Sequence, residues 1–107
     1  MKKLTTFVPL IILGAMASAI AANDHIDFAD LGGIHDFRPD GDQGIYIEGQ
    51  NRQWYHADFF KPCRELQFND RVGFVVEPTG DLNRFSSILV GGEQCYFQTF
   101  EQVEKPE

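Results

Sequence analysis

The feature that most limits how this chain can fold is its only pair of cysteines, Cys63 and Cys95. An even number of cysteines in an oxidising compartment predicts a disulfide. The bond would close a loop of about 33 residues and, on chain-entropy reasoning, contribute roughly 3–4 kcal/mol to folding. The alternative is a pair of metal-binding or redox thiols, although the spacing is not that of a C-x-x-C pair.

The N-terminal segment supplies the context that such a bond requires. Two lysines are followed by an apolar run over residues 7–16 and by small residues at 17–22, which include an A-x-A arrangement. The run is shorter than the about 20 apolar residues of a transmembrane helix. We therefore expect residues 1–21 to be a signal peptide, cleaved near Ala21-Ala22, with an uncleaved anchor as the alternative. The mature protein would be periplasmic or secreted and have no membrane span.

Residues 22–107 have the length of one domain and an acidic, aromatic composition. Of ten phenylalanines only Phe7 lies in the leader, and the domain also contains Trp54 and three tyrosines. This high content of aromatic residues indicates a packed core. Without the two leader lysines, seven of the nine basic residues remain against 16 acidic ones, a net charge of −9. That charge argues against nucleic acid as a partner, because phosphate binding needs basic residues. It favours a basic envelope or extracellular protein instead.

Strand patterns dominate this domain. Residues 44–48 and 53–59 flank a turn at 49–52 and predict a hairpin. Residues 34–38 alternate as a further strand would, and residues 71–77 are apolar on both faces, as in a central strand. Alternation within 53–59 predicts that Tyr55, Ala57 and Phe59 face the core, and that Trp54, His56 and Asp58 are exposed or half-exposed.

A second hairpin is predicted over residues 84–90 and 93–100, because Gly91-Gly92 can adopt the positive φ angles of a two-residue turn. Counting back from that turn places Ile88 opposite Cys95, which would point the cysteine into the core. Pro62 could open one helical turn that carries Cys63 inward.

The sequence therefore predicts a mainly β fold: a small antiparallel sheet of five or six strands curled into a barrel or sandwich. It would contain at most one short helical turn and one disulfide. The charged tail, residues 102–107, is expected to fray.

The segments together resemble a family of small exported bacterial proteins catalogued as a domain of unknown function. The similarity covers most of residues 34–100, from Ile34-His35-Asp36-Phe37-Arg38 to Gly92-Glu93-Gln94-Cys95. Its most specific part is the two cysteines with the strand Arg84-Phe85-Ser86-Ser87-Ile88 before the second. The resemblance implies export, a small β-rich fold and paired cysteines, and it implies no activity. Relatives commonly carry Asp where this chain has Ser86, so any chemistry of that Asp is absent here.

Few residues suggest chemistry. His35, His56 and Asp58 are metal-ligand candidates, since imidazole and carboxylate can hold zinc or copper, but a solvated strand face has the same pattern. No catalytic residue and no cofactor is predicted, because bonded cysteines cannot act as nucleophiles. Tyr46, Trp54 and Tyr96 would make an aromatic binding face if the sheet leaves them exposed, and otherwise a second core layer.

The function that these observations favour is a non-enzymatic, exported binding or interaction module. One form of it is a lysozyme-inhibitor-like protein, since those are also small, exported, β-rich and directed at a basic enzyme. The alternatives are a metal-binding envelope protein that uses His35, His56 and Asp58, and a small enzyme with a concave pocket of titratable groups.

Overall fold

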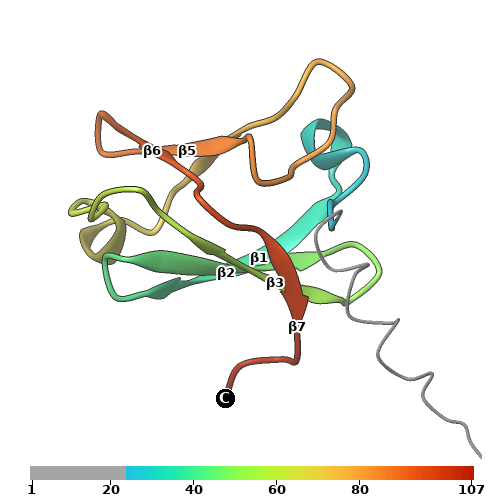
Figure 1. Cartoon of the computed structure of the whole chain (residues 1–107), viewed down its shortest axis with the longest axis horizontal. Coiled ribbons are helices and arrows are strands. Elements are labelled where there is room, and N and C mark those ends of the chain that lie inside the picture. The colour runs from blue at the N-terminus through green and yellow to red at the C-terminus, as the bar shows by residue number, and fades with distance from the viewer. Residues whose placement is uncertain (1–23) are drawn as a thin grey trace, which may run out of the picture.

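The computed structural model describes residues 24–107, and the predicted signal peptide lies outside the described residues. The described part forms two antiparallel sheets (Figure 1). The larger has the order β1-β2-β3-β7 and the smaller the order β4-β5-β6. The strands are β1 (Ile34–Asp40), β2 (Gly44–Gly49), β3 (Trp54–Asp58), β4 (Gly73–Val75), β5 (Ser87–Val90), β6 (Glu93–Tyr96) and β7 (Glu101–Val103).

The mainly β fold is confirmed, but its details differ from the expectation. Residues 24–107 contain seven strands in two sheets, which do not close into a barrel. The strand predicted as central, β4, lies at an edge of its sheet, with β5 in the middle. Two short 3-10 turns occur instead of one at Pro62, namely η2 (Ala29–Leu31) and η3 (Leu66–Phe68). No helix in this part of the chain has the length and apolar character needed to cross a membrane.

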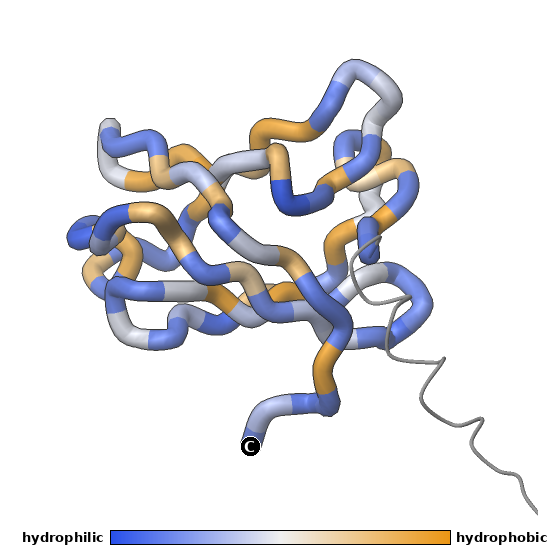
Figure 2. Tube along the Cα trace, viewed as in Figure 1, coloured by the Kyte–Doolittle hydropathy of each residue, from blue (hydrophilic) through white to orange (hydrophobic). Residues whose placement is uncertain are grey.

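The core lies between the two sheets and combines alternate residues of the strands with residues of the segments that connect them (Figure 2). Ile45 and Ile47 of β2 are fully buried against the smaller sheet, which contributes Ile88 and Val90 of β5. Ring contacts also join the sheets, since Phe37 of β1 lies edge-on to Phe74 of β4 with the centroids 6.2 Å apart. The predicted core residues of β3 and its end, Tyr55, Ala57 and Phe59, are buried.

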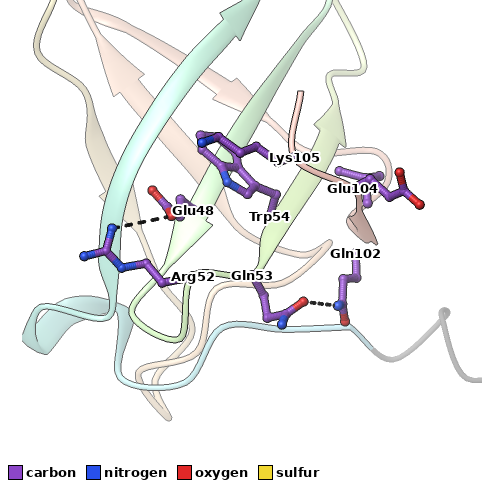
Figure 3. A pocket seen from close by; sticks show the side chains of 8 residues that line it. Glu48, Arg52, Gln53, Trp54, Gln102, Glu104 and Lys105 are labelled. Carbon is purple, nitrogen blue, oxygen red and sulfur yellow. Dashed lines mark hydrogen bonds and ion pairs between the residues drawn. The ribbon is translucent and has the colours of Figure 1, made fainter. Parts of the chain in front are cut away.

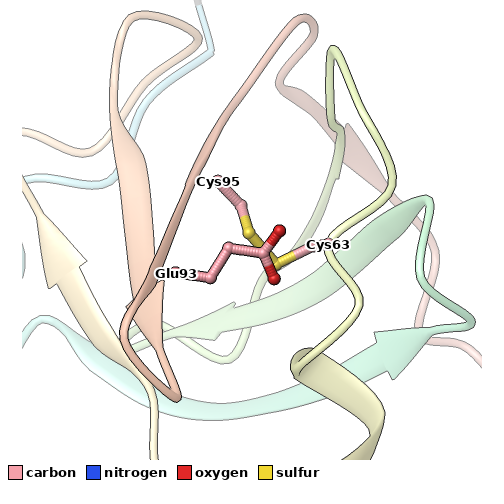
Figure 4. A group of neighbouring side chains, drawn as sticks. All are labelled: Cys63, Glu93 and Cys95. Carbon is pink, nitrogen blue, oxygen red and sulfur yellow. A yellow bond between two sulfur atoms is a disulfide. The ribbon is translucent and has the colours of Figure 1, made fainter.

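The disulfide between Cys63 and Cys95 is present and connects the loop after β3 to β6 (Figure 4). The predicted register of the second hairpin is confirmed, because Ile88 pairs with Cys95. The φ angles of Gly91 and Gly92 are 58° and 84°, the left-handed values that the turn needs. Cys95 therefore points into the core, where the Cα atoms of the two cysteines are 5.7 Å apart.

The C-terminal segment pairs with β3 and contacts Asp24, the first described residue. Glu101–Val103 forms β7 by pairing with Trp54, Tyr55 and His56 of β3. The carboxylate of Asp24 accepts a hydrogen bond from the backbone N–H of Gln102. The tail predicted to fray, residues 102–107, therefore begins within β7, where the outer edge of β3 offers backbone hydrogen bonds.

Candidate functional site

Charged side chains gather on the outer face of the larger sheet, around His56 of β3. Its Nε2 atom lies 2.9 Å from Oδ2 of Asp40, at the end of β1, and its Nδ1 atom lies 3.8 Å from Oδ1 of Asp58. Glu101 stands directly opposite His56 on β7. We call Asp40, Asp58 and Glu101 the acidic patch. Three strands supply it, and half of each aspartate side chain is exposed.

The surrounding residues hold His56 and Asp58 in place. Gly44 of β2 leaves room for the imidazole, since a Cβ atom there would approach His56 Nε2 to 2.9 Å and the Ala57 carbonyl to 2.8 Å. The ring of Tyr46 lies 4.6 Å from that of His56. Thr99 accepts a hydrogen bond from the Asp58 backbone N–H and donates one to its carboxylate. The patch is thus an ordered surface.

The predicted metal set is not assembled. His35 lies in a bulge of β1 and its Nε2 atom is 2.8 Å from Nη1 of Arg52, near Glu48. His56 faces Asp40 and Asp58 with opposite ring nitrogens, whereas a metal ion takes one nitrogen from one imidazole. Among residues 24–107, His35, His56 and Asp58 are not one of the groups whose ligand atoms lie within 4.8 Å of one another.

The predicted aromatic face is also not one surface. Tyr46 is half-buried beside His56, while Trp54, expected to be at least half-exposed, is only 4% exposed. The Arg38 guanidinium covers the indole at 5.0 Å from its centroid and donates a hydrogen bond to the Pro106 carbonyl. Tyr96 is 55% exposed, but it belongs to the smaller sheet. Strand alternation could not reveal this, because Trp54 is covered by Arg38 and by the C-terminal segment, both distant from it in sequence.

An open hollow lies where that segment meets Trp54 (Figure 3). Its lining includes Val103 and Lys105 of the C-terminal segment and Glu48, which pairs with Arg52 at 3.8 Å. A bond between the side chains of Gln102 and Gln53 ties β7 to the residue before β3. Trp54 is the only tryptophan of the chain, so changes around this hollow can be followed by its fluorescence.

Removing residues 101–107 is therefore expected to shift the emission maximum of Trp54 to longer wavelength. The indole loses β7 and the Pro106 carbonyl that positions Arg38. Part of its burial is lost too, at a cost of about 1–2 kcal/mol of unfolding free energy. Steady-state fluorescence and urea unfolding measure both effects. Removing Glu107 alone is the control and should change neither, whereas unshifted emission in the longer truncation would contradict this account of Trp54.

Two further groups of potential ligand atoms occur among the described residues. The first is Cys63, Glu93 and Cys95, in which the Glu93 carboxylate lies beside the disulfide (Figure 4). No cysteine of residues 24–107 is free, so the metal-thiol alternative does not apply. The second is His25, Asp27 and Asp81. Sequence reasoning missed it, because only the spacing of His25 and Asp27 by two residues hints at it.

Ser86, in the segment before β5, has a structural role. Ser86 is 2% exposed, and its Oγ atom accepts a hydrogen bond from the backbone N–H of Asn83, 3.0 Å away. Its carbonyl accepts another from the N–H of Phe97. Ser86 therefore stabilises the turn that leads into β5.

A family model described as a family of unknown function (DUF6491) matches residues 1–107. No curated protein and no solved structure matches the chain.

Proposed function

The chain belongs to that family of unknown function, and we propose that it is an exported, non-enzymatic binding module that recognises a basic protein through the acidic patch. The convergence of Asp40, Asp58 and Glu101 around His56 carries this proposal. Ordered, half-exposed carboxylates can receive lysine or arginine side chains with little loss of conformational entropy. The net charge of −9 over residues 22–107 would also steer a basic partner toward the domain.

Several observations favour binding over catalysis. The only two cysteines are joined, so neither is available as a nucleophile. The sheet under the patch is held by a packed core and a disulfide, and rigid elements of this kind present a contact surface without reorganisation. A lysozyme-inhibitor-like role is the specific form of the proposal.

The test uses a basic lysozyme and cytochrome c as probes, with calorimetry for binding and cell-wall lysis for inhibition. We expect binding that weakens as salt rises, because exposed charges are screened. The pair D40N/D58N should lower the affinity at least about tenfold. The pair D70N/E107Q, which removes the same charge from exposed sites outside the patch, should leave it nearly unchanged.

The outcomes separate the general proposal from its specific form. Binding of lysozyme without inhibition would remove the inhibitor form and keep the module. If neither basic protein binds at micromolar concentration, recognition of basic proteins is wrong. Equal losses in the two double variants would show that net charge, and not the acidic patch, determines binding.

A further inference from the structure

A second cluster of ligand atoms lies at the junction of the N-terminal segment with the loop before β5. His25, Asp27 and Asp81 each offer one ligand atom, and all three atoms lie within 4.8 Å of one another. Nε2 of His25 and Oδ1 of Asp27 are 3.0 Å apart. Ligands around a tetrahedral zinc ion are about 3.3 Å apart, given bond lengths of about 2.0–2.2 Å. Small side-chain rotations would therefore close the set around one ion.

The backbone beneath the cluster is fixed. Ile26 and Leu82 form an antiparallel bridge with two hydrogen bonds of 2.9 and 3.0 Å, and both side chains are buried in the core. Two more backbone bonds flank this bridge, from the N–H of Ala29 to the Gly80 carbonyl and from the N–H of Glu77 to the Asp81 carbonyl. Backbone hydrogen bonds thus fix the segments that carry the three ligand residues.

The same bridge places like charges together. On either side of an antiparallel pair the next residues also face each other, so Asp27 and Asp81 are opposite neighbours. Like charges in that position destabilise a sheet. More than half of the Asp27 side chain is exposed, and Asp81 is half-buried, so an ion can reach both carboxylates. A divalent cation between the two carboxylates would offset their mutual repulsion, because both are attracted to the ion.

We propose that His25, Asp27 and Asp81 form a binding site for a divalent transition-metal ion, with zinc as the best fit. An imidazole nitrogen with two carboxylates is a ligand set that zinc accepts, whereas calcium takes oxygen ligands alone and more of them. Water fills the remaining coordination position. This site is separate from the acidic patch and does not depend on the proposed binding of a basic protein.

The test is titration of the purified, metal-free protein with zinc, followed by calorimetry and by X-ray absorption of the bound ion. We expect one zinc per chain, coordinated by one imidazole and oxygen ligands, and no binding of calcium in the same range. H25A and D81N should each weaken zinc binding at least about tenfold. D30N and H35Q are matched controls, since they remove a nearby carboxylate and another histidine outside the cluster, and both should bind zinc as the parent does.

D81N is the decisive variant because Asp81 joins the set only through the fold. Its metal-free circular dichroism and Tm establish that it is folded. Zinc bound equally by D81N and the parent would overturn the proposal, since the ion would then be held by the N-terminal segment alone. Loss of zinc in H56A, with H25A unaffected, would also overturn it. D81N should still bind lysozyme like the parent, so its effect on zinc binding is independent of the acidic patch.

Discussion

Replacing Cys63 and Cys95 together by alanine is expected to lower the free energy of unfolding by about 3–4 kcal/mol. The bond joins residues 32 positions apart and connects the loop after β3 to the second hairpin. Its loss frees a large loop in the unfolded chain, whose added entropy favours unfolding. For a domain of this size we expect Tm to fall by about 15–25 °C.

Thermal unfolding by circular dichroism measures the effect, and reduction of the unaltered protein provides the comparison. Both samples should lose similar stability, because each removes the same covalent link. Alanine is the appropriate substitute, since both positions are buried and serine would add an unpaired hydroxyl group. An alanine variant that melts within a few degrees of the parent would contradict a stabilising role for the disulfide.

The second large effect is expected from F97A, at about 3–5 kcal/mol of unfolding free energy. Phe97 is 2% exposed, and its ring stacks on that of Phe100 with the centroids 5.9 Å apart. Its backbone pairs with Phe59 in an isolated bridge, so the residue connects the end of β3 with the segment after β6. Truncation would leave a cavity in the middle of the core.

Chemical denaturation measures the loss, and F85A is the matched control. Phe85 is 69% exposed, and its truncation should change the free energy of unfolding by no more than about 0.5 kcal/mol. Equal effects of the two variants would mean that the aromatic cluster around Phe97 is not the centre of the core. F97L should fall between F97A and the parent, because leucine fills part of the space.

The parts of the fold that sequence reasoning predicted are those determined locally. Two adjacent glycines determined the turn and register of the second hairpin, and that register placed Cys95 in the core. Strand alternation likewise identified the buried face of β3. Alternation assigns a residue to a face of a sheet but does not identify what covers that face. For this reason Trp54 was expected outside, although Arg38 and the C-terminal segment cover it.

The candidate sites depended on contacts between distant segments, and these could not be predicted. His56 and Asp58 were recognised as a pair, but Asp40 and Glu101 join them only through the pairing of β1, β2, β3 and β7. Asp81 meets Asp27 only because the Ile26–Leu82 bridge closes. A single sequence contains no local signal for such a bridge, since its hydrogen bonds are made by backbone N–H and C=O groups that every residue except proline has.

The bond between Asp24 and Gln102 has a consequence for how the domain can be attached or rearranged. The polypeptide enters and leaves the domain at neighbouring points, next to the outer edge of β3. A segment joined before Asp24 and one joined after β7 would both start beside β3, so the domain could be inserted into another protein as a side branch. For the same reason a short linker could make the chain circular, with new ends opened at the exposed Gly91-Gly92 turn.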